Sequence, residues 1–62
     1  MKQVWKVTNM VNGFKVVIMV RGTEAELQDY IKSELPNAVK YVGAMDEEVK
    51  AAELLGMPIY MA

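Results

Sequence analysis

The longest apolar run of the chain, residues 14 to 20, constrains the fold more than any other feature. It reads Phe-Lys-Val-Val-Ile-Met-Val, and four of its seven positions are β-branched. Such residues favour strands over helices, and the run is far shorter than the roughly 20 residues of a membrane-spanning helix. We therefore expect it to form the central strand of a small sheet that the rest of the chain covers.

A hairpin joins this run to the residues before it. Residues 3 to 11 read as a first strand, and Asn12-Gly13 is the strongest short-range signal for a type I′ hairpin turn. A two-residue turn fixes the register of the two strands. The pairs predicted for one face are Val11 with Phe14, Asn9 with Val16, Val7 with Ile18, and Trp5 with Val20. Those predicted for the other face are Met10 with Lys15, Thr8 with Val17, Lys6 with Met19, and Val4 with Arg21.

The two faces of this hairpin differ in chemistry. The first is predicted to be the core face because it is almost wholly apolar; it comprises Trp5, Val7, Val11, Phe14, Val16, Ile18 and Val20. The second mixes aliphatic and cationic side chains, which predicts a half-covered surface. Either the long cationic side chains lie over the aliphatic ones, or the surface contacts a partner. The candidate sheet-face interface is Val4, Lys6, Thr8, Met10, Lys15, Val17, Met19 and Arg21.

Four further elements follow the hairpin. Thr23 and Glu26 form a capping-box pattern that begins a helix over residues 24 to 34, and Pro36 ends it. Residues 38 to 43 read as a third strand, parallel to the second. A second helix is predicted from Asp46, as its cap, to residue 55, followed by a short edge strand over residues 57 to 61. The predicted fold is a single α+β domain over residues 1 to 62. It is a two-layer sandwich in the order β-β-α-β-α-β, with a small mixed sheet and both helices on one face.

The second helix has more apolar surface than one sheet face can cover. Its apolar arc, with Leu54 included, spans about 220° at 100° per residue, so either Val49 or Leu54 should be exposed or meet another chain. A second candidate interface, on this helical face, is therefore Asp46, Glu47, Glu48, Lys50 and Leu54.

The amino-acid composition argues against several kinds of functional site. The chain has no cysteine and no histidine, so we expect no disulfide, no metal site of the usual kind and no cofactor. Catalysis lacks a histidine base, Thr23 is better explained as a cap, and Asp46-Glu47-Glu48 lacks the pattern of a calcium loop. We therefore do not expect this protein to be an enzyme. The apolar fraction of 53% exceeds the usual value of about 45 to 50%, which favours association in so short a chain.

The distribution of charge leaves open a second kind of function, the binding of a nucleic acid. Residues 1 to 22 carry four cations and no acid (+4), whereas residues 23 to 62 carry eight acids and three lysines (−5). The basic sheet face, with Lys40 as a further member, could bind a single-stranded nucleic acid. That partner is disfavoured because this face has no aromatic stacking residue and the chain is acidic overall. We find neither a signal peptide nor a membrane span, and the expected location is the cytoplasm.

The function expected from these observations is non-enzymatic protein binding, with homo-oligomerisation through the sheet face or its edge. The alternative is an inhibitor of a host enzyme. In size and composition the chain is similar to small phage and mobile-element inhibitors such as anti-CRISPR proteins. The acids of both helices would then compete with nucleic acid for a basic groove on the target; these are Glu24, Glu26, Asp29, Asp46, Glu47 and Glu48.

Overall fold

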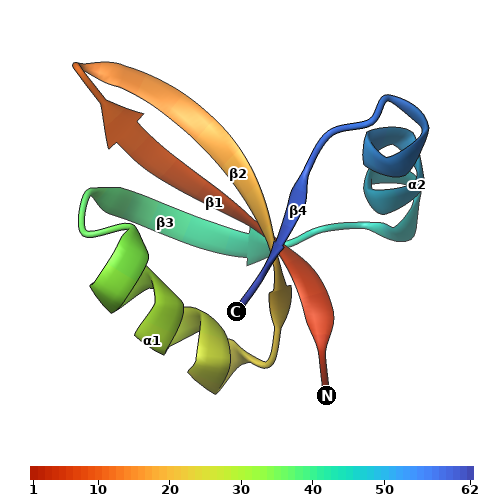
Figure 1. Cartoon of the computed structure of the whole chain (residues 1–62), viewed down its shortest axis with the longest axis horizontal. Helices are drawn as coiled ribbons and strands as arrows, with labels where there is room; N and C mark the ends of the chain where they lie inside the picture. The colour runs from red at the N-terminus through yellow and green to blue at the C-terminus, as the bar shows by residue number, and fades with distance from the viewer.

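The computed structural model describes all 62 residues as a four-stranded mixed sheet with two helices (Figure 1). The elements are β1 (Gln3–Val11), β2 (Phe14–Gly22), α1 (Glu24–Glu34), β3 (Ala38–Gly43), α2 (Asp46–Leu54) and β4 (Ile59–Met61). The strand order is β3-β1-β2-β4, with β1 antiparallel to both neighbours and β4 parallel to β2. The predicted α+β class and the order of elements are confirmed, and β4 is two residues shorter than expected.

The β1–β2 hairpin has the predicted register throughout. All eight predicted pairs, from Val4 with Arg21 to Val11 with Phe14, are present. Asn12 and Gly13 both have positive φ, 50° and 84°, as a type I′ turn requires. This turn therefore sets which side chains share each face of the sheet.

Helix α1 covers the first face at the end of the sheet distant from the turn. Its capping box is formed: the Glu26 N–H donates to Thr23 Oγ1 (3.1 Å), and the Thr23 N–H donates to Glu26 Oε1 (2.9 Å). Leu27 of α1 is fully buried with Val7 and Val20 of the sheet, and Leu35 completes this core cluster. Tyr30 and Ile31 of α1 are partly buried against the same cluster.

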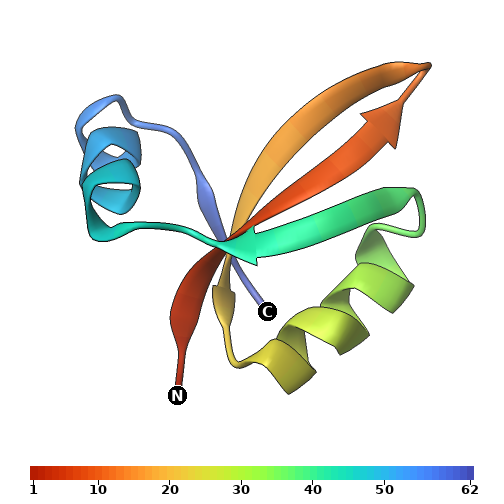
Figure 2. The ribbon, with the colours of Figure 1, turned by 180° about the vertical axis from the view of Figure 1, so that it is seen from behind.

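Helix α2 lies against the opposite face, so the prediction that both helices share one face is wrong. Ala52 of α2 is buried with Val4 and Met19, which belong to the second face of the hairpin. Figures 1 and 2 show α1 and α2 on opposite sides of the sheet. At the end of the sheet distant from the hairpin turn, the molecule therefore has three layers (α1, sheet and α2) instead of the predicted two.

The strand order explains this placement. Strands β2, β3 and β4 run in the same direction. The connection through α1 crosses β1 to reach β3, and the connection through α2 returns across β1 and β2 to reach β4. Parallel crossovers are almost always right-handed, and two crossovers of one hand that run in opposite directions must lie on opposite faces. The helix placement therefore depends on strand order, which the sequence did not give.

The predicted core face is buried over only part of its length. Val11, Phe14 and Val16, near the turn, are 45%, 74% and 42% exposed. The reason is length: nine strand residues extend about 30 Å, whereas the eleven residues of α1 extend about 16 Å. The hairpin tip therefore projects beyond both helices, as Figure 1 shows.

Candidate functional site

The second sheet face is divided into a covered half and an open half. Helix α2 buries Val4 and Met19, so these two predicted interface residues form core instead. Toward the turn the face is open, and β3 adds two residues because Lys40 lies opposite Thr8 and Val42 lies opposite Lys6. We call this half the open sheet surface; it comprises Thr8, Met10, Lys15, Val17, Lys40 and Val42.

Val17 lies where three hollows of this surface meet, and its side chain is 55% exposed. Thr8, Lys40 and Val42 line the hollow toward β3. The hollow toward α2 is lined by Met19, Ala51, Ala52, Leu55 and Met57, with Lys6 and Glu48 at its rim. The third, toward β4, is lined by Val16, Ile18, Met19, Met57, Pro58 and Tyr60. Val17 therefore lies at the centre of a continuous surface that is largely apolar.

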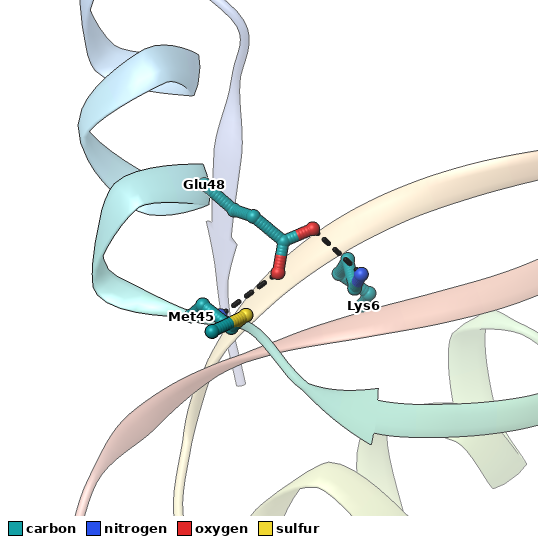
Figure 3. A network of polar contacts seen from close by, with 3 residues as sticks. All are labelled: Lys6, Met45 and Glu48. Atoms are coloured by element: carbon teal, nitrogen blue, oxygen red, sulfur yellow. Dashed lines mark hydrogen bonds and ion pairs between the residues drawn. The ribbon is translucent and has the colours of Figure 1, made fainter.

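Glu48 fixes α2 to the sheet beside these hollows (Figure 3). One carboxylate oxygen accepts a hydrogen bond from Lys6 Nζ at 2.6 Å, and the other accepts one from the Met45 N–H at 2.9 Å. The hydrogen bond from Lys6, followed by the one from Met45, holds the pKa of Glu48 below its ordinary value. Lys6 was predicted to belong to the sheet-face interface and Glu48 to the helical-face interface. In the structure the two residues form one contact that holds α2 on the sheet.

Asp46 is not the cap of α2. The N-cap is Met45, and Asp46 is the first helical residue. Met45 has no side-chain oxygen to accept a hydrogen bond from the helix, and Glu48 provides half of a capping box through its bond to the Met45 N–H. The acid-rich first turn still matches the positive end of the helix dipole.

The rest of the candidate helical interface is exposed but dispersed. Asp46, Glu47 and Lys50 face solvent, and Leu54 is 88% exposed. Val49 instead packs beside the buried Ala52 cluster, so the surplus apolar residue of α2 is Leu54. It is flanked in sequence by Glu53 and Leu55 and does not line any of the hollows around Val17.

The acidic residues do not form one surface, since α1 and α2 lie on opposite faces of the sheet. On α1, Glu24 accepts a hydrogen bond from the Tyr41 hydroxyl at 2.8 Å. Glu26 is engaged in the capping box, and the hydrogen bond from the Thr23 N–H lowers its pKa. The inhibitor alternative therefore has fewer free acids than the sequence suggested.

The basic residues are dispersed as well. Lys6 is ion-paired with Glu48 and Arg21 is partly buried, which leaves Lys15 and Lys40 exposed on the open sheet surface. No aromatic side chain belongs to that surface. Two lysines without a stacking platform give little support to a nucleic-acid site.

The residues with potential for chemistry have structural partners. Ser33 Oγ donates to the backbone oxygen of Asp29 (3.1 Å) or Tyr30 (3.3 Å), and Thr23 caps α1. No three acidic, histidine or cysteine residues converge as metal ligands would. Both helices are too short and polar to cross a bilayer. What the arrangement provides is an exposed, largely apolar surface around Val17.

A free strand edge borders this surface. Strand β4 pairs with β2 only at Met19, Val20 and Arg21, so Phe14 to Ile18 have no neighbouring strand on that side. The sequence pointed to Lys15 and Val17, and to Lys40 as a further member. It missed Leu55 and Met57, because their approach to Val17 depends on α2 crossing the second face; the surplus apolar arc of α2 was the only signal.

Comparison with protein families, with curated proteins and with solved structures finds no match for this chain. No relative therefore indicates a function or a functional residue.

Proposed function

We propose that this chain is a non-enzymatic protein-binding module that associates with further copies of itself. The binding site is the open sheet surface together with the adjoining edge of β2. The observation that carries the proposal is the position of Val17. It is a half-exposed aliphatic residue on the free edge of β2, with apolar hollows on its α2 and β4 sides.

The balance of buried and exposed apolar residues supports association. Seven apolar residues are buried, whereas thirteen large apolar side chains are exposed. Single exposed apolar residues are ordinary on a protein surface, but contiguous patches mark binding sites. Phe14 and Val16 are exposed on the first face of β2 and Val17 on the second, so apolar side chains flank the free edge of β2 on both faces.

The sheet supports binding better than the helical face does. Leu54 is more exposed than Val17, but it lies outside every hollow around the sheet. The β2 edge also offers unpaired backbone groups, which bind strands of other chains. A second copy presents the same strand edge and can satisfy those groups reciprocally.

Amide NMR spectra recorded over a dilution series test this proposal. Self-association through the proposed site predicts concentration-dependent shifts or broadening at Thr8, Lys15, Val17 and Val42. The amides of Glu47 and Leu54, on the helical face, should stay constant. Spectra that do not change with concentration would contradict self-association, and changes confined to α2 would move the site to the helical face.

A further inference from the structure

The backbone groups of Lys15 and Val17 are free on the outer side of β2. In an antiparallel hairpin with a two-residue turn, Val11 and Phe14 form a hydrogen-bonded pair, and such pairs recur at every second residue. Asn9 with Val16 and Val7 with Ile18 are therefore also hydrogen-bonded pairs. Lys15 and Val17 alternate with these residues along β2, so they point their backbone N–H and C=O groups away from β1. The Ala62 N–H donates to the backbone oxygen of Arg21 at 2.9 Å, so the backbone of Arg21 points away from β1. Lys15 and Val17 each lie an even number of positions from Arg21 along the strand, so their backbone groups point the same way.

We propose that two copies of the chain join through these edges, with β2 antiparallel to the partner's β2 and a two-fold axis beside Val16. This inference rests on the proposed function and specifies its geometry. Lys15 then exchanges two hydrogen bonds with the partner's Val17, and symmetry repeats them. The two four-stranded sheets become one continuous sheet.

The register follows from the pattern of free groups and charges. Outward-pointing residues must face one another, so the two-fold axis passes beside residue 15, 16 or 17. An axis at Lys15 would set two lysines directly opposite, which is unfavourable. An axis at Val17 would pair Lys15 with the partner's Met19, whose outer side is already paired with Ile59. The axis at Val16 avoids both conflicts.

The side chains complement one another in this register. On the α1 side of the sheet, Phe14 lies opposite the partner's Ile18, and Val16 lies opposite the partner's Val16. These cross-strand pairs of aromatic and β-branched residues stabilise antiparallel sheets. On the α2 side, Lys15 lies opposite the partner's Val17, so no like charges meet. The exposed side chains of Phe14 and Val16 would thus gain apolar neighbours from the partner.

The helices leave space for this pairing. The hairpin tip projects beyond α1 and α2 in both views (Figures 1 and 2). Strand β4 ends its pairing at Met19, which is one residue beyond the segment that the partner would occupy. A partner strand along Phe14–Ile18 would begin beside the first residue of β4, and it would pack against Met57 and Pro58, which line the hollow beside Val16 and Ile18.

Single-cysteine variants test the register, since the natural chain has no cysteine to interfere. Val16 is the one residue that would face its own copy, with the close spacing of a non-hydrogen-bonded pair. We expect V16C to form a disulfide-linked dimer on mild oxidation at least about tenfold faster than V11C. Val11 is a matched control on the same sheet face and similarly exposed (45% against 42%), but it lies on β1, one strand from the edge. Circular dichroism would establish that both variants fold.

The outcomes separate this inference from the proposed function. If V16C crosslinks no faster than V11C while the wild-type protein is dimeric in solution, edge pairing is wrong and association through the sheet face remains. A wild-type protein that is monomeric at every concentration overturns both. A heterodisulfide between K15C and V17C, formed on mixing in preference to either homodimer, would support the same register independently.

Discussion

Glu48 shows how one residue can connect an element to the sheet. Its carboxylate bridges Lys6 on β1 and the N–H of Met45, at the start of α2. It therefore replaces the missing side-chain cap and positions the helix over Val4 and Met19. The other acids of the same turn, Asp46 and Glu47, have no ion-pair partner. Glu48 is distinguished from them by contact, which the run of three acids in the sequence did not reveal.

The lowered pKa of Glu48 predicts a dependence of stability on pH. A carboxylate whose pKa is lower in the folded protein stabilises it above the unfolded pKa, about 4.3 for glutamate. That stability is lost as pH falls through the lowered folded value; Glu26 contributes in the same direction. We expect E48Q to unfold at lower urea concentration than wild type at pH 7, with the difference closing at acid pH. E47Q, the neighbouring control, should match wild type. An equal urea midpoint for E48Q and wild type at pH 7 would contradict the role of Glu48.

At the scale of elements, the two helices are held by cores of different size. The α1 cluster contains Val7, Val20, Leu27 and Leu35, with partly buried residues such as Trp5 and Tyr41 around it. The rings of Trp5 and Tyr41 meet edge to face with centroids 5.5 Å apart, an arrangement that adds to the stability gained from burial. The α2 cluster has only three buried residues, and one is an alanine. We infer that α1 contributes most of the stability of the domain.

Leucine-to-alanine substitutions on the two helices test this difference. Leu27 is fully buried, and such a substitution in a core costs about 2 to 5 kcal/mol. A core this small supplies at most about 3 to 5 kcal/mol of net stability, so L27A should be largely unfolded by circular dichroism. L54A, the same change at an exposed residue of α2, should alter the free energy of unfolding by no more than about 0.5 kcal/mol. A folded L27A with the thermal midpoint of L54A would contradict the assignment of the core.

At the scale of the whole molecule, the sequence predicted what local signals control. Asn12-Gly13 fixed the hairpin register, and Thr23 with Glu26 fixed the start of α1. The side of the sheet that α2 covers depends on strand order, a non-local property. The exposure of Phe14 and Val16 depends on how far α1 reaches along the hairpin, so alternation alone misplaced them in the core.

The residues of the candidate site also fall into two groups, those that local sequence signals predicted and those that depend on the path of α2. Lys15 and Val17 followed from the hairpin register and were placed on the correct face. Val4 and Met19 were assigned to that interface too, and α2 covers them. Leu55 and Met57 could not be assigned without the path of α2. The site therefore combines residues of local origin with residues that only the assembled fold brings together.

Sedimentation equilibrium of the wild-type protein tests the central claim most directly, with V16K and V11K as paired variants. The monomer mass is 7.0 kDa. Association through the β2 edge predicts a wild-type mass that rises to about twice this value as concentration increases. V16K, which would set two lysines against each other at the two-fold axis, should remain a monomer, whereas V11K should associate as wild type does. A wild-type mass of 7.0 kDa at every concentration would contradict the account.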